Sequence, residues 1–590
     1  MKRLWIPVLS VAAVGAILYG VRIAERHKSS GIASLLPRST VAFAHLPDFN
    51  GTVEDWHKAD IYQIYLEPAV QEFLKNPKSQ PPRPGSVPAR VDEFQQLKAR
   101  DAFVALTSIA NDKPKLVAGF EYHCSSDVAD RVIGNWRSYI NPTAQREQVE
   151  YQKHQIEVFR QSSYSIAMVR DQNWFFASND LDELKAVLDR ADGRTKDREA
   201  LLTGDPSYTD AMAAMPASFA LLTYVQPKPF AERLAAATNS SKDQNQNLLL
   251  AQIRSLCLAT RFDGGKLRDT LFVGIPKQEQ SAELTRSSLG MATRSTILYA
   301  ANLVDFSKPA GALFPVGDNN ALGPAAKKIG DALAAAGVSA ADWQAALGSE
   351  LSLISEWPEQ ARWPSFLLSA AVKDGARARK IVDALTRGTG PDEHWEQGDR
   401  NGAHYWSLVS ASGWFSIRPV MALSDRVWVA GLDAPSVDEA VQRASQPGPG
   451  LADSEPYRKT EGLVPAPTKF FAYVDPAQIY SRIEATVRPF LFMGALFVPA
   501  ASSVDLGKIP PPEAVTKHLS PIVASQRYAG NGYIAESVGP LTLNQAGLGV
   551  AVLGGFGAMA YHKMNPLDGL KGLPLPVPRG KAAPAPTATP

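Results

Sequence analysis

The strongest constraint on the fold is a stretch of sequence that occurs twice. Residues 173–191, NWFFASNDLDELKAVLDRA, return without a gap as residues 426–444, RVWVAGLDAPSVDEAVQRA. In both copies an apolar run ends at an alanine, an aspartate (Asp180 or Asp433) stands where a helix would be N-capped, and the helix ends on Arg-Ala. The pattern predicts the same strand–helix unit at both places, with Trp174, Phe176 and Leu184 in a core.

Other segments recur at a similar separation of about 250 residues. Arg-Ser-Thr stands at 38–40 and at 294–296, DPSY at 205–208 resembles DSEPY at 453–457, and PASFALLTYV at 216–225 resembles PTKFFAYV at 467–474. The regular separation indicates an internal duplication. We therefore expect a first repeat over 32–290 and a second over 291–538.

Within each repeat, short apolar strands alternate with helices. Residues 165–177 read as a hairpin that turns at 171–173, and residues 257–275 as a hairpin around Asp-Gly-Gly at 263–265, a strong turn signal. Hairpins with helices between them are typical of antiparallel sheets. The predicted fold class is α+β: two similar lobes of antiparallel sheet with helices packed on one face of each.

The two ends of the chain carry uncharged apolar runs. Residues 4–20, LWIPVLSVAAVGAILYG, predict a membrane anchor over 1–28 with a transmembrane helix at about 4–21. A cleaved signal peptide is the alternative, and the missing small-residue cleavage site favours the anchor. Residues 541–561 predict a second transmembrane helix, with small residues on one side for helix packing; a Gly-rich buried hairpin or core helix is the alternative. Residues 562–590 predict a disordered Pro/Ala-rich tail.

The distribution of positive charge predicts a topology. Lys2 and Arg3 precede the first run, and five basic residues follow the second, which places both termini in the cytoplasm and the body outside it. The expected location is therefore the inner membrane with an extracytoplasmic body, and the lipid bilayer is an expected partner. Residues 490–498, FLFMGALFV, are too short to span a bilayer; they predict core packing or, alternatively, a patch that meets membrane or a protein partner.

Composition excludes some function classes. The net charge is +2, from 61 basic and 59 acidic residues, so no general field favours nucleic acid. The two cysteines, Cys124 and Cys257, are too few for a structural zinc site. They form either one disulfide or two separate thiols.

The sequence contains none of the common catalytic motifs that were compared with it by pattern and spacing. A nucleophile elbow, a phosphate-binding loop, a zinc-protease helix and a calcium loop are all missing from the sequence. His394 and His404 lie ten apart among acidic residues that include Glu396 and Asp399, which predicts either a loose metal site or a solvated charged loop. The charged loop is favoured, so the sequence predicts no catalytic, cofactor-binding or metal-binding residues and no cofactor.

Two phrases, LLPRSTVAFAHLPDFNGT after the anchor and the WFFASNDLDELKAVLDRA strand–helix unit, resemble bacterial membrane-anchored envelope proteins known only by a domain of unknown function. The resemblance covers residue 35 to about residue 553. It implies a membrane-anchored protein with a duplicated extracytoplasmic body, and it carries no catalytic residues.

The sequence leaves three functional hypotheses. The first is a non-enzymatic binding or assembly module of the bacterial cell envelope, with an envelope protein as partner. The second is the handling of lipid or another hydrophobic ligand, with residues 490–498 at the site. The third is a hydrolase of a kind that the motifs do not identify.

Overall fold

The computed structural model describes most of the chain between Ser30 and Gly547. The described ranges are 30–74, 87–109, 114–138, 140, 144–161, 164–195, 197–230, 232, 252–277, 283–305, 331–387, 393–410, 418–494 and 508–547. Contacts group the residues up to Asn544 into one compact unit.

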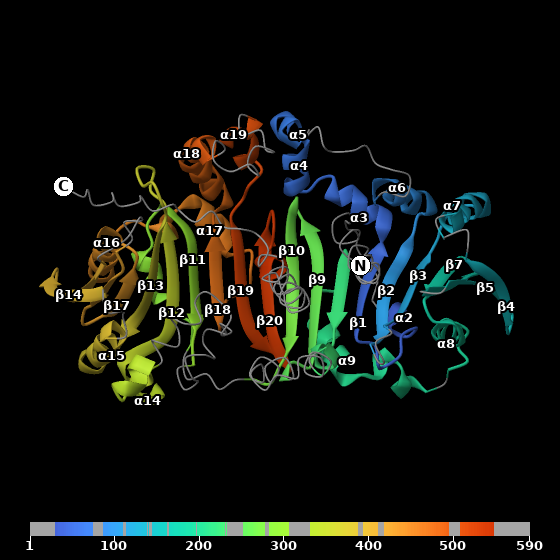
Figure 1. The fold of residues 1–590 in the computed structure, drawn as a ribbon, viewed down its shortest axis with the longest axis horizontal. Helices are drawn as coiled ribbons and strands as arrows, with labels where there is room; N and C mark the ends of the chain where they lie inside the picture. Colours follow the sequence, from blue (N-terminus) through green and yellow to red (C-terminus); the bar gives the residue numbers. More distant parts are fainter. Residues whose placement is uncertain are drawn as a thin grey trace, which may run out of the picture. The chain divides into compact units, whose positions relative to one another are not determined.

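One sheet of twenty strands runs through this unit (Figure 1). The strands of the first half are β1 (Ala42–Asp48), β2 (Arg100–Ser108), β3 (Lys115–Glu121), β4 (Gln145–Tyr151), β5 (His154–Gln161), β6 (Tyr164–Asp171), β7 (Trp174–Ser178), β8 (Leu221–Val225), β9 (Ser255–Asp263) and β10 (Lys266–Gly274). Those of the second half are β11 (Thr296–Leu303), β12 (Leu347–Glu356), β13 (Ser365–Val372), β14 (Glu393–Arg400), β15 (Ala403–Ser410), β16 (Val420–Leu423), β17 (Val427–Gly431), β18 (Phe470–Val474), β19 (Ile522–Ala529) and β20 (Gly532–Gly539).

The strand order is the same in both halves. The first half pairs in the order β4-β5-β6-β7-β3-β2-β1-β8-β9-β10. The second pairs as β14-β15-β16-β17-β13-β12-β11-β18-β19-β20. Each strand of the first half therefore has its counterpart ten strands later, and all pairs are antiparallel.

The halves join edge to edge, and this corrects the predicted fold class. β10 pairs with β20 along their length, from Leu267 opposite Gly539 to Val273 opposite Tyr533. An unpaired edge strand leaves a row of N–H and C=O groups open, and this pairing satisfies them for the last strand of each half. The prediction of two separate lobes is wrong, because the described residues form a single continuous sheet.

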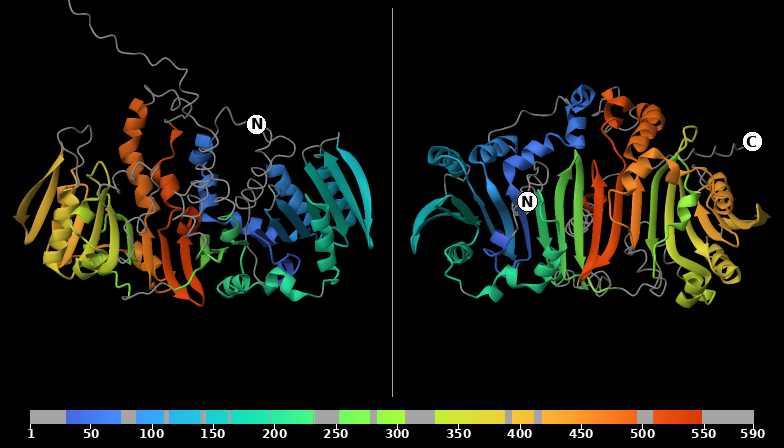
Figure 2. Two further views of the ribbon diagram at one scale, coloured as in Figure 1. Left: turned by 60° about the horizontal axis from the view of Figure 1, so that its bottom comes forward. Right: turned by 180° about the vertical axis from the view of Figure 1, so that it is seen from behind.

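Helices cover both faces of the sheet, not one as predicted (Figure 2). In the first half, α2 (Ser30–Ala33), α8 (Leu181–Ala191) and α9 (Pro206–Ala213) contribute to one core cluster, and α3 (Phe49–Trp56), α6 (Val87–Leu97) and α7 (Ser126–Ser138) to the other. Consecutive residues of β1 divide between them: Phe43 belongs to the first cluster and Ala44 to the second. Because side chains alternate across a strand, the two clusters lie on opposite faces.

The second half has the same two-sided arrangement. α16 (Ala434–Ser445) and α17 (Glu455–Glu461) pack on one face, and α14 (Ala340–Ala346) and α15 (Gly375–Arg387) on the other. The remaining α-helices in the described ranges are α4 (Asp60–Leu66), α5 (Pro68–Leu74), α18 (Pro476–Gly494) and α19 (Pro512–Thr516).

The repeated strand–helix unit lies where the sequence predicted it. Asp180 N-caps α8 by accepting from the Glu183 N–H at 2.9 Å, and Asp433 N-caps α16 by accepting from the Ser436 N–H at 2.8 Å. Phe176 and Leu184 are fully buried, as predicted. Trp174 is half-buried and stacks on Phe176, with ring centroids 5.3 Å apart.

Both predicted hairpins of the first half are confirmed. β6 and β7 turn at residues 171–174, and β9 and β10 turn at Gly264 and Gly265. These glycines have φ of +56° and +85°, a left-handed conformation that glycine adopts at little steric cost because it has no Cβ.

The transmembrane part of the predicted fold class finds no support. Within the described ranges, no helix combines the length and the apolar character needed to cross a membrane. The predicted span at 4–21, residues 548–561 of the second span, the tail 562–590 and the side chains of 490–498 lie outside what the structure describes. Of the second span, residues 541–547 are described, and Thr542 and Asn544 donate hydrogen bonds to the buried Asp269 of β10.

Candidate functional site

The charged segment considered for a metal is a regular hairpin. β14 and β15 pair with His394 opposite Val409 and Asp399 opposite His404. The His404 ring lies 2.6 Å from Asp399 through Nδ1 and 3.1 Å from the Arg379 guanidinium through Nε2. A guanidinium at one ring nitrogen repels a metal cation at that position, so this hairpin offers no metal site.

The two cysteines are separate thiols. Cys257 is fully buried on β9, Cys124 is half-buried, and neither is bonded. Burial raises the pKa of both thiols above the ordinary value. Because the thiolate is the reactive form, neither cysteine has the character of a catalytic nucleophile.

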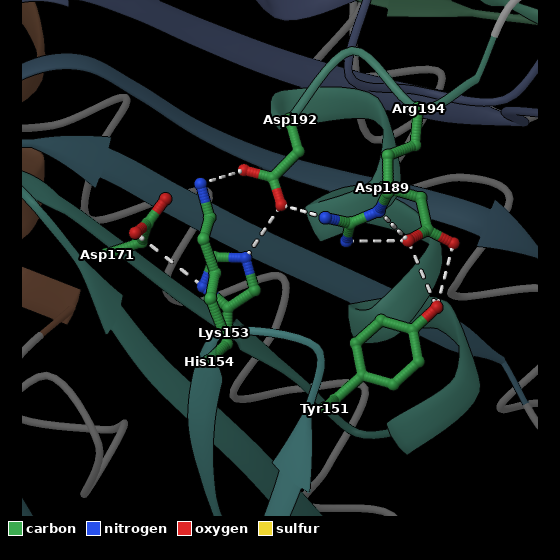
Figure 3. A network of polar contacts seen from close by, with 7 residues as sticks. All are labelled: Tyr151, Lys153, His154, Asp171, Asp189, Asp192 and Arg194. Atoms are coloured by element: carbon green, nitrogen blue, oxygen red, sulfur yellow. Dashed lines mark hydrogen bonds and ion pairs between the residues drawn. The ribbon is translucent and has the colours of Figure 1, made fainter.

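A buried histidine organises a polar network in the first half (Figure 3). His154, at the start of β5, is 3% exposed. Its Nε2 lies 2.9 Å from Asp192 Oδ2, just after α8, and its Nδ1 lies 3.6 Å from Asp171 Oδ1, at the end of β6. These three groups have ligand atoms within 4.8 Å of one another, a spacing that suits a metal ion.

Two carboxylates of this network, Asp192 and Asp189, are already neutralised by side chains. Asp192 also receives the Lys153 ammonium at 2.9 Å and the Arg194 guanidinium. Arg194 bonds Asp189 as well, which accepts from the Tyr151 hydroxyl at 2.9 Å (Figure 3). Burial alone would raise the pKa of Asp192, but the hydrogen bonds from His154 and Lys153 and the charges of His154 and Arg194 lower it to about 2. Two fixed cations beside the same carboxylate oppose a metal ion, so we interpret the network as structural.

The equivalent described positions of the second half do not form this network. The strand pairings and the helix caps place Ala403 where the first half has His154, Ser445 where it has Asp192, and Ser424 where it has Asp171. By contrast, a shared contact is kept: Arg190 donates to the Leu35 carbonyl and Arg443 donates to the Met291 carbonyl. The halves thus share their helix anchoring and differ in their polar side chains.

A cavity of about 200 Å³ lies in the second half, between α16, β12, β13 and the 3₁₀ helix η6 (Ser287–Met291). Its polar lining comprises Ser287, Ser288, Glu350, Ser352, Ser369, Arg426 and Arg443. The rest of the wall is small or apolar: Gly290, Met291, Ala370, Ala371, Val427, Ala444 and Pro447. Hydroxyl groups therefore dominate the polar surface of the cavity.

The hydroxyls of the cavity are only partly satisfied. Ser288 Oγ donates to Ser352 Oγ at 2.5 Å and lies 3.0 Å from the Tyr299 hydroxyl. Ser369 is 1% exposed, and its Oγ has no hydrogen-bond partner in the described part of the chain. A buried hydroxyl without a partner costs free energy, so this part of the core is less well satisfied than its surroundings.

The first half shows why the cavity exists. The register places Phe103 where the second half has Ser352, Gly119 where it has Ser369, and Phe176 where it has Val429. The Phe103 and Phe176 rings fill the space, 6.4 Å apart, over Gly119. A Cβ at Gly119 would stand 2.6 Å from Phe176 and 2.8 Å from Phe103, so glycine is required under the two rings. Replacing both rings by smaller side chains leaves the volume open and makes room for Ser369.

The cavity residues were not identified from the sequence. The available signal was the repeat itself, because an alignment of the two halves puts serine at 352 against phenylalanine at 103 and serine at 288 against the buried Ile32. Serine in place of two large core residues indicates an open polar space. The separation between equivalent positions changes from 256 at β1 to 249 at β2, and the strand pairings are needed to align them.

Comparisons with known proteins do not assign this chain to a family. No protein-family model matches this chain, and no curated protein sequence matches it. Two crystal structures of TP0453 match part of it. Crystal form III is 8% identical, the match covers 42% of this chain and 81% of that chain, and the TM-score is 0.22. Crystal form I is 7% identical, the match covers 44% of this chain and 82% of that chain, and the TM-score is 0.23. Likeness at this level supports no statement about fold or function. The resemblance to envelope proteins stays a prediction.

Proposed function

We propose that this protein is a non-enzymatic binding module of the bacterial cell envelope, which holds a small polar molecule in the cavity of its second half. The observation that supports this is the exchange of the buried rings Phe103 and Phe176 for the smaller Ser352 and Val429, beside which the second half has its cavity. A duplicated core that has been opened and lined with hydroxyls in one copy alone is suited to binding.

The chemistry of the lining favours binding over hydrolysis. The lining residues include neither histidine nor cysteine, and Glu350 is the one carboxylate among them. Glu350 Oε2 accepts from the Thr285 N–H, the Thr285 hydroxyl and the Arg286 N–H, each at 2.9 Å. An activated serine needs a base within hydrogen-bond reach. The partners of Ser288 are two other hydroxyls, and the Ser287 hydroxyl makes only a long contact, 3.4 Å, with Glu350 Oε1.

The location of the protein is part of the proposal and rests on the sequence. The expectation of an extracytoplasmic body comes from the charge distribution near the two termini, and the envelope protein partner is part of the binding-module hypothesis. Protease accessibility of the body in intact spheroplasts tests it: digestion supports the proposed location, and protection until lysis refutes it.

Binding is tested by filling the cavity with the first half's own side chains. The double variant Ser352→Phe/Ser369→Gly restores the ring and removes the Cβ beneath it, as at Phe103 and Gly119. A thermal-shift screen of small polar metabolites against the full chain should find at least one that raises the Tm of the wild type and leaves the double variant unchanged. Thr209→Phe, on the exposed surface of α9, is the control that must still respond.

Two outcomes count against binding in this cavity. In one, no compound stabilises the wild type; in the other, the filled variant responds as strongly as the wild type does. Far-UV circular dichroism and the Tm without ligand establish that the double variant is folded, so that loss of binding is not loss of structure.

A further inference from the structure

The charges around the cavity are of both signs and stand on different elements. Arg426 is an exposed residue of the β16–β17 turn, and its guanidinium has no hydrogen bond or ion pair within the described ranges. Arg443, in the last turn of α16, donates to the carbonyls of Met291, Ala292, Gly448 and Pro449. Arg443 is thus held by main chain, whereas Arg426 is free to bind a ligand carboxylate.

The two carboxylate oxygens of Glu350, a lining residue of the cavity, differ in their partners. Its Oε2 has three donors, but the contact recorded for Oε1 is a long one, 3.4 Å from the Ser287 hydroxyl. The first half explains the difference, because the equivalent Asp101 accepts from His45 Nε2 at 2.9 Å, and the residue equivalent to His45 is Ala301. Loss of this histidine leaves a buried carboxylate oxygen with lone pairs for a ligand donor.

The volume of the cavity limits the size of the ligand. A space of about 200 Å³ is smaller than the sites of roughly 300–1,000 Å³ that bind drug-sized ligands, so the ligand is a small molecule.

We propose that the cavity binds an amino-acid-sized zwitterion. The carboxylate of the ligand pairs with Arg426, and its ammonium donates to Glu350 Oε1. This assignment rests on the proposed binding function. It adds the requirement that both charges be present on one small molecule.

The experiment measures binding to the full chain by isothermal titration calorimetry. The probes are glycine, L-alanine, L-serine and L-aspartate, with acetate, ethylamine and glycerol as analogues that lack one or both charges. At least one amino acid should bind at least tenfold more tightly than any of these analogues. Arg426→Gln should reduce the affinity for that amino acid at least tenfold. It should leave the Tm of the free protein unchanged, because Arg426 is exposed.

Two variants separate a specific site from a general charge effect. Glu350→Gln keeps an acceptor for the Thr285 and Arg286 N–H groups and removes the negative charge. It should therefore also reduce the affinity for the amino acid about tenfold. Arg377→Gln, on α15, removes another exposed positive charge, on the opposite face, and should bind like the wild type.

The outcomes distinguish this inference from the function on which it rests. If glycerol or acetate binds as tightly as every amino acid, the zwitterion assignment is overturned, and the cavity stays a binding site. Unchanged amino-acid affinity in Arg426→Gln also overturns the assignment. If none of the probes binds and the metabolite screen is negative as well, both proposals fail together.

Discussion

Asp269 offers the sharpest test of how the two halves are joined. It lies on β10 in the middle of the sheet, opposite Ser537 of β20, and is 0% exposed. Thr542 donates to its Oδ2, and Asn544 donates to its Oδ1 at 3.1 Å. Burial raises the pKa of the carboxyl to about 7 against these two hydrogen bonds, which lower it.

The raised pKa makes Asp269 a source of instability at high pH. The carboxyl has a pKa of 3.8 in the unfolded chain and about 7 in the folded protein. Below pH 3.8 it is protonated in both states and does not lower the free energy of unfolding. As pH rises from 3.8 toward 7, the unfolded chain loses this proton more readily, so the free energy of unfolding falls. Since one pKa unit corresponds to about 1.4 kcal/mol, the full cost above pH 7 is at most about 4 kcal/mol. Asparagine has the same shape without the charge, so Asp269→Asn should be more stable than the wild type at pH 8 by about 2–4 kcal/mol.

Urea unfolding at pH 5, 6, 7 and 8 measures this difference. The gap in the free energy of unfolding between Asp269→Asn and the wild type should widen with pH and level off above pH 7. Asp425→Asn, in an exposed turn, controls for the loss of one negative charge and should give a gap near zero. An Asp269→Asn variant that is less stable than the wild type at pH 8, or a gap that does not change with pH, refutes the reasoning.

Three further predictions concern the ion network, the filled core and the repeated cap. Asp192→Asn removes a carboxyl whose pKa is lowered to about 2, so it should lower the free energy of unfolding by about 2 kcal/mol at pH 7 and by about half of that at pH 3. In the same urea experiments the control Asp182→Asn, at a side chain that is 87% exposed, should change it little. Phe103→Ala should lower the free energy of unfolding by about 3–5 kcal/mol because it removes a ring from a packed core. Ser352→Ala, beside the existing cavity, should lower it by about 1 kcal/mol. Equal losses would contradict the presence of a cavity at Ser352. Asp433→Ala should cost about 1 kcal/mol through the lost N-cap of α16, and Asp433→Ser should restore most of it.

Local features of the fold were predictable from the sequence because neighbouring residues determine them. The Asp-Gly-Gly turn at 263–265 needs residues that tolerate positive φ, and the N-caps at Asp180 and Asp433 need a short side-chain acceptor before a helix. Phe176 and Leu184 were placed in the core by periodicity alone.

The covering of both sheet faces had a sequence signal that the predicted fold class did not use. β1, AFAHLPD, and β16, VMAL, are nearly continuous buried runs in place of an apolar–polar alternation. Such runs are typical of strands with packing on both sides. The prediction followed the hairpin pattern, which indicates pairing and does not indicate which faces are covered.

The sequence by itself determined that the chain is built from two similar units, and where their turns, caps and strand–helix corners lie. The tertiary structure decided three other things: the joining of β10 to β20, the two-sided packing and the cavity under α16. Strand pairing brings together residues such as Leu271 and Ala535, which are far apart in the chain, and a strand's own pattern does not specify its partner. The cavity depends on which side chains meet across neighbouring strands. Ser352 and Ser369 can be recognised as cavity residues only because the sheet places them where the other half has Phe103 and Gly119.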